Sequence, residues 1–85
     1  MNKRDIEKLI EFALDWYNQV EEDPVKIEEI FFNAYSDTGD ALFEEGYVKE
    51  ITDTAIIVAT HDSEGNEEEI IMVSLDKIAI LTFGA

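Results

Sequence analysis

The chain has 85 residues, which is enough for one domain and leaves no room for a second core. It contains no cysteine and a single histidine, His61. Disulfides and thiolate metal sites are therefore excluded, and we expect neither a metal nor a cofactor. The net charge is −15, from 21 acidic and 6 basic residues. Such a charge repels phosphates and anionic membranes at long range, which argues against nonspecific binding of nucleic acid driven by charge.

Two features bear on where the protein works. Met1–Asp5 is not followed by the apolar run of a signal peptide. No apolar stretch approaches the length of about 20 residues that spans a bilayer. We therefore expect a cytoplasmic protein.

A first helix is predicted over residues 2–22. Asn2 and Asp5 can cap its start, and Pro24 is expected to stop it. Apolar residues recur at spacings of three and four, which indicates one buried stripe. The stripe consists of Ile6, Leu9, Ile10, Ala13, Trp16, Tyr17 and Val20, with Phe12 and Leu14 lying off it. Its periodicity favours a core or interface role for Trp16 and Tyr17 over stacking against a ligand.

Residues 25–35 allow two interpretations. Asp23-Pro24 with Glu28 resembles a helix start. Residues 30–35 are instead rich in strand-forming types and run into the turn-like residues 37–40. We predict a strand over residues 26–36, and the helix remains an alternative.

The rest of the chain is predicted to be β-structure. Gly46 marks a bend inside one strand, Thr52-Asp53 forms a tight turn, and residues 62–66 form a hairpin loop. The predicted strands are 41–51, 54–60, 68–73 and 78–83, with a single turn at 74–77. The expected fold is mainly β with one N-terminal α-helix, followed over residues 26–83 by a strongly bent, five-stranded antiparallel barrel. Residues 1–85 form one domain.

This order of elements resembles the Sm/LSm family, whose barrel is of the SH3-like kind. Asp40-Ala41, Gly46 and Asp53 stand near the positions of the family's first motif, and the segment 72–80 has the shape of its second motif. Ala41 replaces the motif glycine, Ser74-Leu75 replaces an Arg-Gly pair, and Lys77 replaces an asparagine.

The resemblance implies a homo-oligomeric ring, of roughly five to seven subunits, in which the fourth strand of one copy pairs with the fifth strand of the next. The expected interface consists of Ile70, Ile71, Met72, Val73, Ile78, Ile80 and Leu81. The alternative is that the first helix covers these edges within one subunit. The resemblance also implies binding of single-stranded RNA, or of DNA, in RNA or DNA processing. The residues expected to contact it are Tyr47, Lys49, Asp53, Thr54, Ser74, Asp76 and Lys77.

No residue pattern indicates an enzyme. With 21 carboxylates, pairs lie near each other by chance, and nothing marks one as a general acid. His61, Asp62 and Ser63 are neighbours at a hairpin, where the geometry of a catalytic triad would not form. The alternative to nucleic-acid binding is an acidic protein-interaction module that binds a basic partner and imitates the charge of nucleic acid.

Overall fold

A computed structural model describes residues 1–84 as one helix, five strands and two short 3₁₀ turns. The elements in chain order are α1 (Lys3–Val20), η1 (Ile27–Glu29), β1 (Phe31–Tyr35), β2 (Ala41–Ile51), β3 (Ala55–His61), β4 (Glu67–Ser74), η2 (Leu75–Lys77) and β5 (Ile80–Gly84). The prediction of a mainly β fold with one N-terminal helix is confirmed. Among the described residues, no helix has the length and apolar character needed to cross a bilayer.

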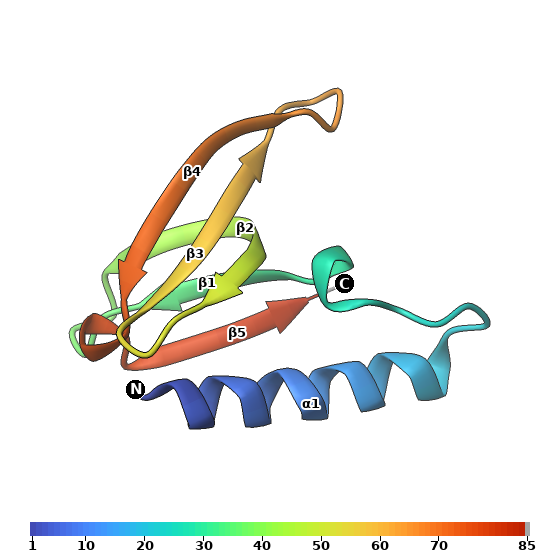
Figure 1. Cartoon of the computed structure of the whole chain (residues 1–85), viewed down its shortest axis with the longest axis horizontal. Helices are drawn as coiled ribbons and strands as arrows, with labels where there is room; N and C mark the ends of the chain where they lie inside the picture. Colours follow the sequence, from blue (N-terminus) through green and yellow to red (C-terminus); the bar gives the residue numbers. More distant parts are fainter. Residues whose placement is uncertain (85) are drawn as a thin grey trace.

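The five strands form one antiparallel sheet in the order β4-β3-β2-β1-β5. Figure 1 shows that β2 bends, so that the β3–β4 hairpin stands away from β1 and β5 while α1 runs alongside β5. In the described part of the chain β4 and β5 do not pair with each other, so the sheet is not closed. Each of these two strands therefore has a strand neighbour on one side only.

Helix α1 forms where its capping residue and apolar spacing predict it. The side chain of Asn2 accepts a hydrogen bond of 2.9 Å from the backbone N–H of Asp5, as expected of an N-cap. The helix ends at Val20, a few residues before Pro24. Ile6 and Ile10 are buried in the core. The stripe predicted from the sequence is only partly buried, because Trp16 and Val20 remain 62% and 61% exposed.

The ambiguous stretch contains both a turn and a strand. Ile27–Glu29 forms η1, and the backbone N–H of Lys26 donates to Oε2 of Glu29 at 3.0 Å. The strand then begins at Phe31 and not at Lys26. The predicted strand is confirmed for residues 31–35, and its predicted first residues are wrong because the Glu29 side chain closes a local turn there.

The bend of β2 depends on a bulge opposite Asn33. The pairing register shifts between Phe32 and Ala34, and the backbone of Glu45 is left-handed, with φ of 55°. Its N–H donates to Oδ1 of Asn33 at 2.7 Å. A Cβ atom on Gly46 would lie 2.1 Å from Cζ of Phe43. Glycine is required there because the Phe43 ring fills that space. The bend predicted at this residue coincides with the bulge.

Two glycine substitutions at this bulge should have opposite effects. Glu45→Gly is expected to raise the free energy of unfolding by up to about 1 kcal/mol, because glycine adopts the left-handed conformation without strain. Glu44→Gly removes the same charge from an ordinary strand position and should lower it by roughly 0.5–1 kcal/mol. Urea unfolding of both variants tests the comparison. A loss of stability in Glu45→Gly equal to that in Glu44→Gly would contradict it.

The core lies between the inner face of the sheet and α1. Phe32 is fully buried, and its ring centroid lies 5.3 Å from that of Phe43 and 6.0 Å from that of Phe83. The other members of the core cluster are Ile6, Ile10, Ala34, Val48, Ile56, Val58, Val73, Leu75, Ile78 and Leu81. Residues from the helix and from all five strands thus meet in one cluster, which holds the loops at the ends of the sheet in place.

Candidate functional site

Four of the seven residues predicted to contact nucleic acid meet at one end of the sheet, which we call the loop end. Asp53 and Thr54 belong to the β2–β3 turn, and Ser74 and Asp76 flank the start of η2. These four residues line a common hollow with Met1, Asn2 and Leu75. The backbone N–H of Leu75 donates to the carbonyl of Thr54 at 2.9 Å, which ties the two loops together.

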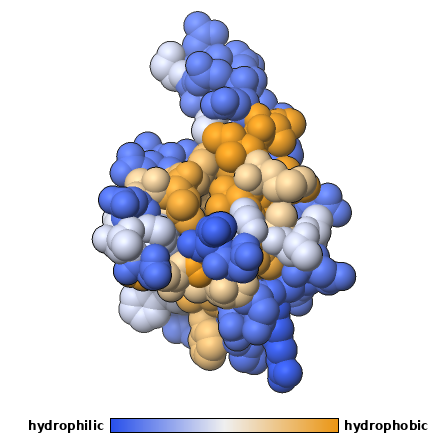
Figure 2. Space-filling view, turned by 90° about the vertical axis from the view of Figure 1, so that its left-hand side faces the viewer, coloured by the Kyte–Doolittle hydropathy of each residue, from blue (hydrophilic) through white to orange (hydrophobic). Residues whose placement is uncertain are grey.

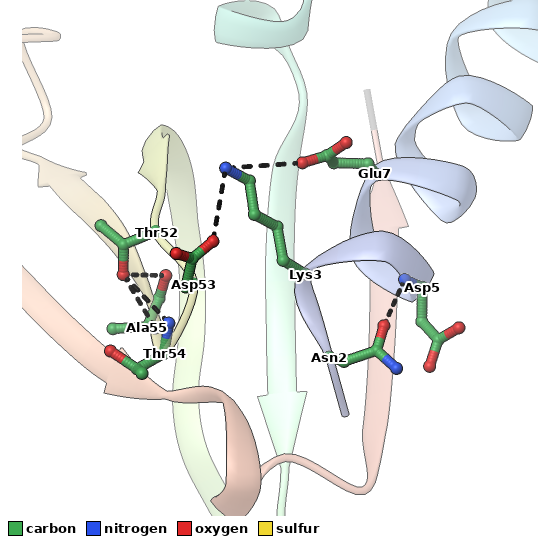
Figure 3. Close-up of polar contacts among 8 residues, drawn as sticks. All are labelled: Asn2, Lys3, Asp5, Glu7, Thr52, Asp53, Thr54 and Ala55. Atoms are coloured by element: carbon green, nitrogen blue, oxygen red, sulfur yellow. Dashed lines mark hydrogen bonds and ion pairs between the residues drawn. The ribbon is translucent and has the colours of Figure 1, made fainter.

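Thr52 organises the β2–β3 turn at the loop end (Figure 3). Its hydroxyl accepts hydrogen bonds from the N–H groups of Ala55, at 3.0 Å, and Thr54, at 3.4 Å. Its own N–H donates to the carbonyl of Ala55 at 2.8 Å, which confirms the predicted tight turn. Nζ of Lys3 lies 4.0 Å from the carboxylate of Asp53 and 3.8 Å from that of Glu7, so the start of α1 faces this turn.

The loop end is acidic. The hydroxyl of Ser74 donates to Oδ1 of Asp76, and this bond, together with the nearby Lys77 charge, lowers the pKa of Asp76 from its ordinary value. The carboxylate of Asp53 is almost fully exposed. The hollow therefore combines the carboxylates of Asp53 and Asp76 with the nearby ammonium groups of Lys3 and Met1.

The other three predicted residues lie elsewhere. Lys77 lines a separate hollow beside the β1–β2 turn. The ammonium group of Lys49 pairs with the carboxylate of Glu67 and lowers the pKa of that carboxyl, chiefly by hydrogen bonding. Tyr47 packs against His61 with ring centroids 4.5 Å apart, one ring edge facing the other ring. Neither Lys49 nor Tyr47 lines the hollow at the loop end.

The residues predicted to form an interface fall into two groups. Ile70, Met72 and Ile80 are 65%, 68% and 52% exposed, in agreement with surface positions on the two edge strands. The side chains of Val73, Ile78 and Leu81 are buried in the core cluster, and Ile71 packs partly against it. Successive residues of a strand point to opposite faces, which places Ile71 and Val73 of β4 and Leu81 of β5 toward the interior. Ile78 lies just before β5 and is also buried. In this second group, only Ile71 keeps a partly exposed side chain.

Apolar surface gathers beside the β3–β4 hairpin. Figure 2 shows it directly below the hydrophilic lobe formed by the tip of that hairpin. Ile70 and Met72 stand opposite Ala59 and Ile57, so these four side chains point to one face of the hairpin. Ala59 is fully buried, and Ile70 and Met72 form most of the exposed part of this face. This face offers an apolar contact area on an otherwise acidic molecule.

Two features were not predicted from the sequence. Phe12, Trp16 and Val20, spaced four residues apart, form an exposed stripe along α1. A hollow on the outer face of the sheet is lined by Phe31, Glu45, Tyr47, His61 and Asp62. The repeat of four residues was visible in the sequence, whereas the hollow joins residues from three strands and had no local signal.

Asp62 organises the tip of the β3–β4 hairpin. Its carboxylate accepts hydrogen bonds from the N–H groups of Asn66, at 3.0 Å, and Glu64, at 2.9 Å, and these bonds lower its pKa. A carboxyl group with a lowered pKa in the folded state stabilises the fold above its ordinary pKa, and that contribution is lost as pH falls through the lowered value.

Asp62→Asn should therefore lower the stability at neutral pH, and the difference from the wild type should shrink as pH falls below about 4. Urea unfolding at a series of pH values measures this difference. A gap that stays constant down to the lowest pH would contradict the role given to the carboxylate.

Among residues 1–84, no group of three or more His, Cys, Asp or Glu side chains is arranged to hold a metal ion. In comparisons with known proteins, no family model, no curated protein and no solved structure matches the chain.

Proposed function

We propose that the chain is a non-enzymatic, cytoplasmic protein-interaction module that associates with copies of itself and binds a basic partner. The observation that carries this proposal is the pair of open edges at opposite ends of one sheet, β4 and β5. Unpaired N–H and C=O groups on an edge strand form a template for another strand unless the edge is protected. In this chain the protection is incomplete on both edges.

The two edges differ in how they are protected. Glu67, Glu68 and Glu69 place charge at the start of β4, whereas its second half has no charged residue. Helix α1 lies beside β5, and the hydroxyl of Tyr17 donates to the carbonyl of Phe83 at 3.4 Å. The helix thus contacts the end of β5, which supports the alternative of helix cover there. In the first half of β5 the side chain of Ile80 is exposed, and we take this part of the strand as the one that pairs with another copy.

Pairing of β4 in one copy with β5 in the next is a head-to-tail contact. Repeated contacts of this kind close into a ring when the rotation between copies allows it. A ring of roughly five to seven subunits is part of the proposal. Exposed apolar side chains on both edges, Ile70 and Met72 on β4 and Ile80 on β5, supply contacts that the backbone pairing alone would lack.

A basic protein suits the surface of this module better than a nucleic acid does. The net charge is −15. Three of the six basic residues, Lys3, Lys8 and Lys49, are engaged in ion pairs within the chain. A dense negative surface attracts cationic surfaces and discriminates against anionic ones. Binding of a basic partner is therefore favoured over a long distance range at low salt.

Single-stranded nucleic acid is the second candidate, and one observation favours it. Asp53, Thr54, Ser74 and Asp76 converge at the loop end from separate loops, as the Sm/LSm resemblance implied for a nucleotide site. Hydroxyl and backbone N–H groups at such a place can contact bases or sugars without basic residues.

A titration distinguishes the two candidates. Labelled oligo-arginine peptide, oligo(U), oligo(A) and mixed single-stranded DNA are each added to the protein below about 50 mM salt, where charge effects are strongest. The proposal predicts that the peptide binds, that its affinity falls as salt rises, and that the oligonucleotides do not bind. Binding of oligo(U) with no binding of the peptide would reverse the order of the two candidates.

A further inference from the structure

The hollow lined by Phe31, Glu45, Tyr47, His61 and Asp62, which we call the aromatic hollow, has the chemistry of a cation site. Its residues come from β1, β2, β3 and the loop that follows β3. It lies on the outer face of the sheet, away from the core and from the loop end. Nothing in the assembly of edge strands uses it.

The aromatic rings of this hollow are held by sheet pairing. Phe31 and Tyr47 stand directly opposite each other on β1 and β2, so their side chains share one face. The edge-to-face contact between Tyr47 and His61 extends the aromatic wall to β3. A Cβ atom on Gly84 would lie 2.7 Å from Cζ of Phe31, so the absence of a side chain there makes room for the ring.

The charges around the aromatic hollow are negative. Glu45 and Asp62 both line it, and the lowered pKa of Asp62 keeps that carboxyl ionised. The nearby Lys49 ammonium group is neutralised by Glu67. Nδ1 of His61 is the one buried side-chain polar atom of residues 1–84 without a hydrogen-bond partner. Unpaired buried polar atoms are rare in folded proteins, so the imidazole beside the aromatic hollow is an unusual feature of this face.

We propose that the aromatic hollow binds an arginine side chain of the basic partner, and this inference rests on the proposed function. A guanidinium group is planar, stacks on aromatic faces and donates N–H groups to carboxylates in a fixed fork. The aromatic wall of Phe31 and Tyr47 provides the stacking faces, and Glu45 and Asp62 provide the acceptors. A phosphate or carboxylate ligand is excluded by the same two carboxylates.

The test uses NMR spectroscopy of the full chain with two blocked peptides, Gly-Arg-Gly and its citrulline counterpart, which has the same shape without the charge. The arginine peptide is expected to shift the resonances of Phe31, Tyr47 and His61 in a saturable way, and the citrulline peptide to leave them unchanged. Equal shifts with both peptides, or shifts spread evenly over the acidic surface, would overturn the proposal.

Matched variants separate this site from general charge attraction. Tyr47→Leu should weaken binding of the arginine peptide about tenfold, as expected for the loss of an aromatic anchor, whereas Tyr35→Leu should not. Glu45→Gln should weaken binding and Glu44→Gln should leave it unchanged, although both remove one charge. If oligo-arginine binds the wild type and all four variants equally, the site is wrong and the proposed function stands. If oligo-arginine does not bind the wild type at low salt, both fail.

Discussion

Phe32→Ala is expected to lower the free energy of unfolding by about 3–5 kcal/mol. Phe32 is fully buried and packs against Phe43 and Phe83, so its removal leaves a cavity among aromatic rings that cannot collapse to fill it. Domains of this size have total stabilities near the lower end of about 5–15 kcal/mol. The substitution should therefore leave the protein at the edge of unfolding at 25 °C.

Chemical denaturation followed by Trp16 fluorescence and far-UV circular dichroism measures this loss. Phe12→Ala is the matched control, because Phe12 is 66% exposed on α1. Phe12→Ala should change the free energy of unfolding by no more than about 0.5 kcal/mol. Equal losses in the two variants would show that the ring of Phe32 does not occupy the centre of the core.

Met72→Lys is expected to abolish self-association while leaving the fold intact. Met72 is 68% exposed on β4, and a lysine on an edge strand is one of the standard obstacles to pairing with another chain. Ile80→Lys should have the same effect from β5, because each contact between copies uses one edge of each kind. The stability of both variants should lie within about 0.5 kcal/mol of the wild type, since neither side chain belongs to the core.

A mixture of the two variants tests the head-to-tail arrangement. Met72→Lys keeps its β5 edge, and Ile80→Lys keeps its β4 edge, so the mixture should form a dimer with one copy of each variant and nothing larger. Leu42→Lys adds the same charge on β2, an interior strand of the sheet, and should leave the assembly unchanged. A mixture that remains monomeric would contradict pairing between unlike edges.

The secondary structure was largely predictable, because its signals are local. Asn2 as a cap and the repeat of apolar residues define α1, and strand-forming types between turn residues define β2, whose bounds were predicted as 41–51. The start of β1 was mispredicted because a capping contact from Glu29 decides it, and that contact depends on side-chain placement.

The surfaces were less predictable, because burial depends on how elements pack. The periodicity of α1 defines one wide apolar arc, and the sequence does not say which half of it faces the sheet. Trp16 and Val20 fell on the exposed half. Val73, Ile78 and Leu81 were expected at an interface, whereas their side chains belong to the core cluster.

In the candidate sites too, features with local sequence signals were predictable, and features that depend on strand pairing were not. The sequence predicted the β2–β3 turn and the turn at η2, and with them a common site for Asp53, Thr54, Ser74 and Asp76, which line one hollow. Tyr47 was grouped with them, but its contact is with His61, which depends on the register between β2 and β3. The register of strand pairing is determined by the packing of the whole core, so no short sequence motif predicts the aromatic hollow.

The mass of the wild-type protein in solution, measured by light scattering on a sizing column at micromolar concentration, tests the central claim most directly. Association through β4 and β5 predicts one discrete species whose mass is several times the 9.7 kDa of the single chain. A single peak at the mass of the monomer would show that the two exposed edges do not pair, and the proposed assembly would be wrong.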